Sequence, residues 1–234
     1  MITDSQHTTP VYAVIVAGGQ GTRMGMALPK QFLQLGGKPI LYHTVASFAR
    51  ALPQAHIILV LPEQDVSKLQ MVLEHFTDRI DMTVVTGGNT RFDSVKNGLQ
   101  HIPKDSIILV HDGVRPFVSD ALIHRCIHAA LEHGAAIPSL AVVDSVRMLG
   151  HDDQFTPVDR NKLRIVQTPQ AFRGDILLPA FEQEYHIDFT DEATVVESLQ
   201  HKVWLVEGER NNIKITTPED LHLAESIIAQ GKNF

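Results

Sequence analysis

The chain has 234 residues, of which 44% are hydrophobic, and this is enough to bury the core of one α/β domain. The net charge of −7 argues against a general nucleic-acid binder, and no apolar run approaches the roughly 20 residues of a membrane-spanning helix. The single cysteine, Cys126, excludes an intramolecular disulfide and a cysteine-rich metal site. We therefore expect a cytoplasmic protein with a single domain, 1–234, that has neither nucleic acid nor a membrane as its partner.

The first predicted element is a buried strand at Val11–Val16 (VYAVIV), a short apolar run rich in β-branched residues. A glycine-rich loop, AGGQGTRMGMALPKQ, follows it at 17–31. A Walker-type loop requires a second glycine five residues after the first, and no glycine of this loop meets that spacing. The dinucleotide pattern GxGxxG begins at Gly19 and Gly21 but has Met24 in place of its third glycine. Neither familiar phosphate loop is therefore present.

What the loop retains is a glycine turn at the carboxyl end of a strand, where open α/β sheets bind ligands. It offers exposed backbone N–H groups and two cations, Arg23 and Lys30, seven residues apart. Such a loop suits a triphosphate. The alternative is that the glycines only turn the chain and that both cations are solvated.

Further apolar runs follow along the chain at 56–62, 82–88, 106–112, 134–142 and 202–208. Helix-like stretches lie at 40–52, 65–76, 175–185 and 218–230. The alternation predicts an α/β fold, with a Rossmann-like, mainly parallel sheet flanked by helices.

The run at 106–112 (SIILVHD) ends in a carboxylate, Asp112, and Arg115 follows it. If this strand is parallel to the first, Asp112 shares a sheet edge with the glycine loop. Mg²⁺ accepts a hard oxygen ligand at such a place and takes other ligands from phosphates and water. We therefore expect Asp112 to bind Mg²⁺, or another divalent cation, as cofactor. The alternative is that Asp112 caps a turn or a helix.

Residues 144–172 break the alternation, because two β-like runs flank the turn-rich segment GHDDQ and a third run follows. We expect an inserted β-arm over 144–166. An isolated hairpin is marginal in water and needs a covering surface, either the body of its own chain or a second subunit. A homodimer through the arm is the expected arrangement.

Several segments resemble the signatures of one known family. They are AGGQGTRM with PKQ (17–24 and 29–31), GGNTRFDSV (87–95), VHDGVRP (110–116), VDRNKLRIVQTPQAF (158–172), TDEAT (190–194) and NNIKITTPEDL (211–221). In this order they resemble the 2-C-methyl-D-erythritol 4-phosphate cytidylyltransferases, of the nucleotide-diphospho-sugar transferase superfamily. The glycine loop alone indicates only the superfamily, whereas QTPQAF and NIKITTPEDL are more specific.

The resemblance implies transfer of CMP from CTP to 2-C-methyl-D-erythritol 4-phosphate, with release of pyrophosphate, in non-mevalonate isoprenoid biosynthesis. A phosphate monoester has a second pKa of about 6, so this nucleophile needs no side chain to remove a proton. That agrees with a sequence in which no Ser/His/Asp or Cys/His arrangement is visible. The reaction needs relief of repulsion between anions, which is electrostatic work.

The resemblance also implies roles for individual residues. Arg23 and Lys30 are the expected catalytic pair, which holds the triphosphate and stabilises the transition state. The expected CTP-binding residues are Ala17, Gly18, Gly19, Gly21, Gly88, Ser94 and Asp112. Among them Gly88 and Ser94 resemble residues on the cytosine and ribose side, and Asp112 resembles the residue near Mg²⁺ and the acceptor. The expected acceptor-binding residues are Arg115, Ser145, Arg160, Thr168 and Lys214. Ser145 and Arg160 lie on the arm and are expected to reach the site of a neighbouring subunit.

Several of these residues have a plainer alternative role. Lys214 could discourage aggregation at a strand edge, and Arg160 could pair with a neighbouring acid. Thr168 could simply occupy the extended position that precedes a proline, and Ser94 could cap a helix.

The sequence departs from the family pattern at a few positions. After Asp112 two alanines are common, and here they are Gly113 and Val114, while a threonine is usual at Ser145. These changes leave open an alternative acceptor, such as ribitol 5-phosphate or a sugar 1-phosphate. A non-catalytic nucleotide-binding module is the alternative from a different class of protein.

Overall fold

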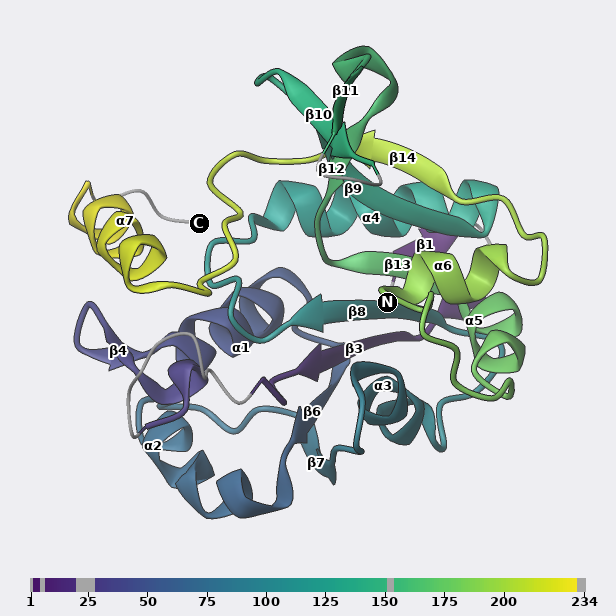
Figure 1. The fold of residues 1–234 in the computed structure, drawn as a ribbon. Helices are drawn as coiled ribbons and strands as arrows, with labels where there is room; N and C mark the ends of the chain where they lie inside the picture. Colours follow the sequence, from purple (N-terminus) through teal and green to yellow (C-terminus); the bar gives the residue numbers. More distant parts are fainter. Residues whose placement is uncertain (1, 5–6, 20–27, 151–153, 231–234) are drawn as a thin grey trace.

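A mainly parallel sheet runs through the centre of the molecule (Figure 1). The computed structural model describes residues 2–4, 7–19, 28–150 and 154–230. Within these residues the main sheet has eight strands, in the order β12-β9-β13-β8-β3-β6-β7, with β14 paired to β9. Their bounds are β3 Val11–Val16, β6 His56–Leu61, β7 Met82–Thr86, β8 Ile107–Asp112, β9 Ala135–Ala141, β12 Arg164–Val166, β13 Gln170–Arg173 and β14 Trp204–Glu207.

The directions of the strands confirm the predicted fold class. β3 pairs in parallel with β6 and β8, β6 with β7, and β9 with β14. The exceptions are β13, which is antiparallel to β8 and β9, and β12, which is antiparallel to β9. Central strands of this kind are buried on both faces, and this explains why they read as continuous apolar runs in the sequence.

Helices cover both faces of the sheet. Their bounds are α1 Ile40–Ala51, α2 Gln70–Leu73, α3 Arg91–Leu99, α4 Asp120–His133, α5 Gly174–Ala180, α6 Glu192–Glu197 and α7 Pro218–Ala229. Alternate residues of β3 point to opposite faces: Ala13 and Ile15 pack with α1 and α4, whereas Val14 and Val16 pack with α3, α5 and α6. The result is a helix–sheet–helix sandwich with a core on each side.

A smaller apolar cluster joins α7 to the loop after β8. Ile227 of α7 packs with Leu35, Val114 and Ile215. α7 begins as predicted, because Thr217 accepts a hydrogen bond from the backbone N–H of Asp220 and Pro218 occupies the first turn. The cluster fixes the segment before α7 against the carboxyl end of β8.

Shorter elements complete the chain. Strands β1 (Ile2–Asp4) and β2 (His7–Thr9) form a small hairpin, as do β4 (Gln34–Leu35) and β5 (Lys38–Pro39). The 3₁₀ helices are η2 Lys30–Phe32, η3 Glu63–Leu69 and η5 Arg160–Lys162. None of the helices in the described ranges is long and apolar enough to cross a membrane.

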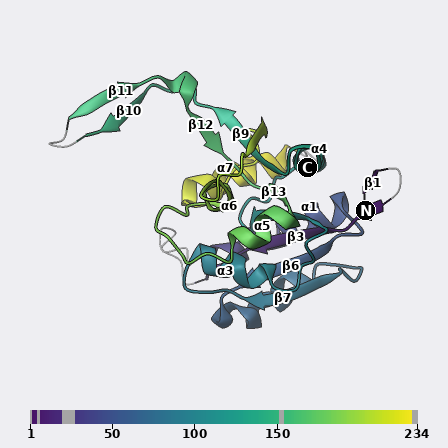
Figure 2. The same ribbon diagram turned by 90° about the vertical axis from the view of Figure 1, so that its right-hand side faces the viewer.

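The predicted arm projects from the body of the molecule (Figure 2). It consists of the antiparallel hairpin β10 (Val146–Leu149) and β11 (Phe155–Val158), followed by η5. The third run, β12, returns to the main sheet beside β9. Large apolar side chains on the arm are exposed to solvent, among them Met148 and Leu149 at 62% each.

The strand register brings two predicted site segments together. Val16, the last residue of β3, is paired with Asp112, the last residue of β8. The glycine loop and Asp112 therefore leave the sheet at the same carboxyl edge, as the sequence predicts.

Candidate active site

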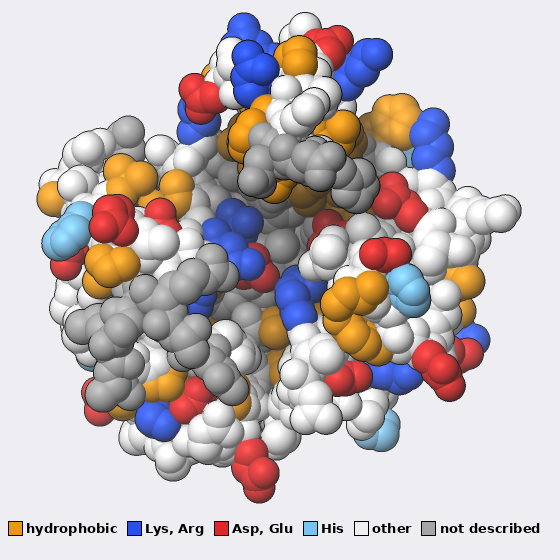
Figure 3. Space-filling model, viewed as in Figure 1, with side chains coloured by type: hydrophobic (Ala, Val, Ile, Leu, Met, Phe, Trp, Pro, Cys, Tyr) orange, Lys and Arg blue, Asp and Glu red, His pale blue; other side chains and the backbone are white. Residues whose placement is uncertain are grey.

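A pocket of about 340 Å³ lies at this carboxyl edge, in the hollow below the arm where basic side chains gather (Figure 3). Its walls come from five separate parts of the chain. They are residues 16–19 at the end of β3, Lys30 and Gln31 of η2, residues 88–91 and Ser94 at the start of α3, Asp112 and Val114 at the end of β8, and Lys214 and Thr216 before α7. The predicted site segments at the glycine loop, at Gly88 and Ser94, at Asp112 and at Lys214 thus meet here. The segment of Thr168 does not line the pocket.

The glycine loop and Lys30 form one wall of the pocket. A Cβ atom on Gly19 would lie 3.3 Å from Cε of Lys30, so the lysine stem runs close along the loop backbone. Gln31 fixes the loop from below, because its side-chain amide donates to the carbonyl of Ala17 at 2.9 Å and to Asp65 at 3.2 Å. Gly21 and Arg23, also predicted for this wall, lie outside the described residues.

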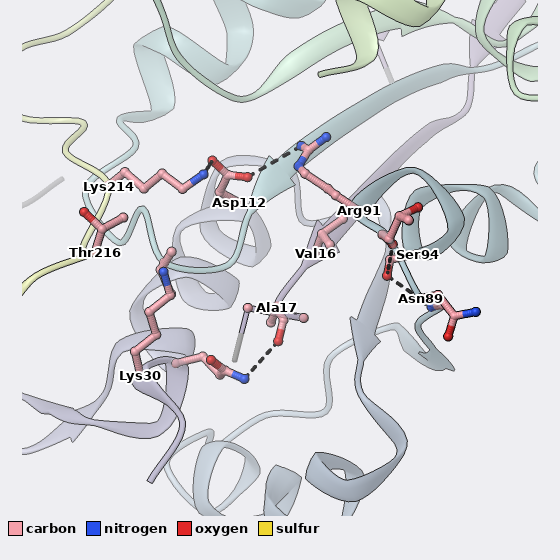
Figure 4. A pocket seen from close by; sticks show the side chains of 15 residues that line it. Val16, Ala17, Lys30, Asn89, Arg91, Ser94, Asp112, Lys214 and Thr216 are labelled. Atoms are coloured by element: carbon pink, nitrogen blue, oxygen red, sulfur yellow. Dashed lines mark hydrogen bonds and ion pairs between the residues drawn. The ribbon is translucent and has the colours of Figure 1, made fainter. Parts of the chain in front are cut away.

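Asp112 stands among three cations, two of which, Lys214 and Arg91, are seen beside it in Figure 4. Its carboxylate lies 3.0 Å from Nζ of Lys214, 3.3 Å from Nε of Arg115 and 3.5 Å from Nη2 of Arg91. Burial by itself raises the pKa of Asp112, but the attraction of the three cations outweighs burial and holds the pKa well below its usual range. Asp112 is therefore an anion at neutral pH, in surroundings with a surplus of positive charge.

A buried hydrogen-bond network supports Asp112 from behind. Thr168 accepts from the backbone N–H of Asp112 at 3.1 Å, and its hydroxyl lies 3.0 Å from Nδ1 of His111. Asn212 donates to the carbonyl of Thr168 at 2.7 Å, and Arg115 donates to the carbonyl of Asn212 at 2.9 Å. The network fixes the carboxyl end of β8 to the segment that carries Lys214.

His111 is neutral within this network. Its ring is fully buried, and burial lowers its pKa to about 4. Its Nε2 lies 3.1 Å from the carbonyl oxygen of Arg115, so both ring nitrogens have partners. The histidine before Asp112 thus has a structural place in the loop that carries the carboxylate.

The start of α3 forms the opposite wall of the pocket. Thr90 and Asp93 make a capping box that fixes the first turn. Ser94 accepts a hydrogen bond from the backbone N–H of Gly88 at 3.1 Å and donates to the carbonyl of Thr90 at 2.9 Å. The cap is therefore Thr90 and not Ser94, which shapes the loop at Gly88. A Cβ on Gly88 would lie 2.3 Å from Cβ of Asp93, so no larger residue fits there without movement.

The acceptor-binding residues predicted from the sequence have different positions. Lys214 lines the pocket, while Arg115 and Thr168 lie behind Asp112 and hold it. Ser145 and Arg160 are exposed on the arm and do not line the pocket of their own chain, and Arg160 donates to the carbonyl of Val143. Their predicted role in a neighbouring subunit stays a prediction.

Two residues that sequence reasoning missed belong to this site. Arg91 lines the pocket and makes a bidentate ion pair with Glu192, a fully buried carboxylate at the start of α6. Burial lowers the pKa of Arg91, but Glu192 and Asp112 together outweigh burial and raise it, so Arg91 stays charged. Both residues occur in segments with family resemblance, GGNTRFDSV and TDEAT, but they lie 101 positions apart and no local pattern pairs them.

The two departures after Asp112 have a structural context. A Cβ on Gly113 would lie 2.8 Å from Cβ of Ala17, so glycine permits the close approach of this loop to the end of β3. Val114 is buried, lines the pocket and accepts a backbone hydrogen bond from Ile215 at 3.0 Å. Both residues thus act on the shape of the pocket wall and not on its charge.

The residues present suit a divalent cation that arrives with a phosphate ligand. Among the described residues that line the pocket, Asp112 is the one carboxylate. A single carboxylate suits Mg²⁺, which keeps several waters and takes its other ligands from phosphates. It does not suit a metal that needs an all-protein cage.

The fold and the pocket define an α/β enzyme of the nucleotidyltransferase class, with a glycine loop and clustered cations at the carboxyl edge of a parallel sheet. The family model described as 2-C-methyl-D-erythritol 4-phosphate cytidylyltransferase (IspD) matches residues 11–230. The chain therefore belongs to the 2-C-methyl-D-erythritol 4-phosphate cytidylyltransferase family.

Individual proteins of that name are similar over almost the whole chain. The protein from Bacteroides fragilis is 48% identical over 216 residues, which is 92% of this chain and 98% of the relative. The protein from Phocaeicola vulgatus is 48% identical over 219 residues, 93% of this chain and 99% of the relative.

Solved structures agree with the sequence relatives. The 4-diphosphocytidyl-2C-methyl-D-erythritol synthase of Anaerococcus prevotii has a TM-score of 0.81 at 30% identity and covers 94% of this chain and 96% of its own. The cytidylyltransferase of Thermus thermophilus has a TM-score of 0.75 at 34% identity, with 94% of this chain and 100% of its own chain covered.

Proposed function

We propose that the protein transfers CMP from CTP to 2-C-methyl-D-erythritol 4-phosphate and forms 4-diphosphocytidyl-2-C-methyl-D-erythritol and pyrophosphate. The observation that supports this most directly is the pocket next to the glycine loop that Lys30, Arg91 and Lys214 line together with Asp112. Family membership supports the choice of nucleotide and acceptor. The cytoplasm is the proposed location, and the buried free thiol of Cys126 is consistent with a reducing compartment.

The chemistry follows from the charges. An oxygen of the acceptor's phosphate attacks the α-phosphorus of CTP, and the bond to the bridging oxygen breaks so that pyrophosphate leaves with the electron pair. The attacking phosphate is largely ionised at neutral pH, and no general base is required. Lys30 and Lys214 reduce the repulsion between the two anions and stabilise the charge that develops on the phosphoryl oxygens.

Mg²⁺ is proposed to accompany CTP, with Asp112 as its protein ligand. When bound, it neutralises charge on the phosphates and polarises the phosphoryl group. Asp112 contributes an ionised oxygen at the point where β8 ends, and Lys214 and Arg115 hold that oxygen in place.

A homodimer through the arm is proposed as the working form. The apolar side chains of Met148, Leu149, Phe155 and Ile165 are all more than half exposed, and exposure of this kind is typical of an interaction surface. Ser145 and Arg160 would then contribute to the neighbouring pocket, as the sequence predicts.

Pyrophosphate release tests the reaction. CTP, UTP, ATP and GTP are each combined with 2-C-methyl-D-erythritol 4-phosphate, ribitol 5-phosphate and glucose 1-phosphate, with Mg²⁺ and with EDTA. We expect turnover only with CTP, methylerythritol phosphate and the metal. Turnover of CTP with another acceptor would retain the proposed nucleotide and contradict the proposed acceptor. No pyrophosphate release in any combination would favour a nucleotide-binding module.

A further inference from the structure

Arg91 occupies a central place between the two predicted halves of the pocket. It is the first residue of α3, and the capping box of Thr90 and Asp93 fixes the turn from which its side chain leaves. Gly88 and Ser94, predicted for the nucleoside, lie on one side of it. Asp112, predicted for the metal and acceptor, lies on the other side, toward which the guanidinium points (Figure 4).

The partner of Arg91 is held rigidly. Glu192 is fully buried at the first turn of α6, where Asp191 is the capping residue. Gln170 of β13 fixes that turn, because its amide donates to Asp191 at 2.9 Å and accepts from the backbone N–H of Ala193 at 3.0 Å. The carboxylate of Glu192 therefore meets Arg91 from a fixed position.

The pair is costly as a purely structural device. Burial of a carboxylate is unfavourable, and an apolar pair of similar volume often stabilises a fold equally well or better. The bidentate contact aligns the guanidinium plane, with Nη2 of Arg91 3.1 Å from Oε2 of Glu192. Arg91 then stays 3.5 Å from Asp112 and does not close onto it as tightly as Lys214 does at 3.0 Å.

We infer that Arg91 contacts the α-phosphate of the nucleotide and that Glu192 is a positioning residue that aligns Arg91 for this contact. The α-phosphate joins the nucleoside to the bond that breaks, so it must cross the space between Ser94 and Asp112, which Arg91 faces. A planar guanidinium is well suited to phosphate oxygens. The inference rests on the proposed function, since it assigns residues for that reaction.

A comparison of CMP with cytidine isolates the α-phosphate. Binding of both compounds is measured by calorimetry for wild type, Arg91→Gln, Glu192→Gln and the double variant. We expect each single substitution to weaken CMP binding by about tenfold to a hundredfold, as for the loss of a charge-assisted contact, and to leave cytidine unchanged. Because Glu192 acts through Arg91, the double variant should bind CMP no more weakly than Arg91→Gln.

Several controls separate positioning from folding. Asp120→Asn removes the carboxylate from an exposed pair with Arg50, at 2.8 Å, and should leave both affinities unchanged. Arg91→Lys keeps the charge opposite Glu192 but loses the bidentate geometry, and it should also lose CMP affinity. This variant still tests the inference if Glu192→Gln does not fold. Glu192→Asp should recover part of the CMP affinity.

Steady-state kinetics complete the test. We expect kcat to fall in Glu192→Gln while KM for the acceptor changes less than about threefold, because the contact belongs to the transferred group. Unchanged CMP affinity in Glu192→Gln, a parallel loss for cytidine, or additive effects in the double variant would overturn the inference. A wild type that binds CMP through Arg91 yet turns over no acceptor would instead overturn the proposed function.

Discussion

Single residues set the electrostatic character of the pocket. Asp112 brings negative charge to a place where CTP and a second phosphate are proposed to bind, and Arg91, Arg115 and Lys214 keep it ionised. The same cations can serve a bound phosphate, so the carboxylate and the ligand share them. Removal of one cation should therefore affect the reaction more than the stability of the fold.

Lys30 offers the simplest test of this view. Lys30→Ala removes a charge that lines the pocket, and we expect kcat to fall about a hundredfold or more, since one group that stabilises transition-state charge is typically worth that much. Rates of pyrophosphate release measure the effect. Lys104→Ala, an exposed lysine outside the pocket, is the matched control and should retain its rate. Near-normal kcat in Lys30→Ala would contradict the mechanism.

His111 links the residue scale to pH. Its pKa in the folded protein is about 4, whereas an unfolded histidine has a pKa of about 6.5, so the unfolded chain binds more protons between these values. The free energy of unfolding should therefore be highest above pH 6.5 and fall by roughly 3 kcal/mol as the pH drops to 4.

Denaturant titrations at several pH values measure this loss. His111→Asn should flatten the dependence in that window, and substitution of the exposed His128 by Gln should not. Asp112 titrates below this window, so its own contribution appears only in stronger acid.

At the scale of elements, the strands were more predictable than the helices. Apolar runs such as Val11–Val16 mark strands that are buried on both faces. Because both faces are buried, nearly every residue of such a strand is apolar, and the run can be recognised in the sequence. The helix expected at 175–185 ends at Ala180, because residues 181–189 wrap around Phe92 instead. The stretch 65–76 contains only the short helices η3 and α2. The first difference comes from tertiary packing, which overrides local propensity.

The site divides along similar lines. Lys30, Asp112 and Lys214 could be predicted because each lies in a segment with family resemblance and beside the end of a strand or helix. Arg91 and Glu192 could not be paired from the sequence, since only the fold brings α3 and α6 together. Arg115 and Thr168 support Asp112 in the chain, and their expected contact with the acceptor stays a prediction.

The loop before α3 yields a prediction at the element scale. Gly88→Ala would place a methyl group 2.3 Å from Cβ of Asp93, within the capping box of α3. We expect KM for CTP to rise about tenfold, since overpacking of this kind costs about 1–3 kcal/mol. Gly150→Ala in the arm, with its nearest neighbour at 3.4 Å, should leave KM unchanged. An unaltered KM in Gly88→Ala would mean that CTP does not use this loop.

At the scale of the whole molecule, the arm is the feature that most needs a partner. Phe155→Asp places a charge on the apolar surface of the arm, where Phe155 is 58% exposed in the single chain. We expect this variant to sediment as a monomer and to lose most of its activity, because Ser145 and Arg160 would no longer reach a second pocket. Lys162→Asp, a charge change on the exposed η5, should remain dimeric. A fully active monomer would remove the shared-site proposal.

The pocket is built from residues near both ends of the chain, and this determines when it can form during synthesis. Its first wall follows β3 near residue 17, and its last cation is Lys214. A ribosome delivers the chain in order, so the pairing of β3 with β8 can form while Lys214 and Asn212 have still to be synthesised. During that interval Asp112 lacks one of its cations and part of its support. A nascent chain can therefore pair β3 with β8 before it contains all the residues that the proposed reaction needs.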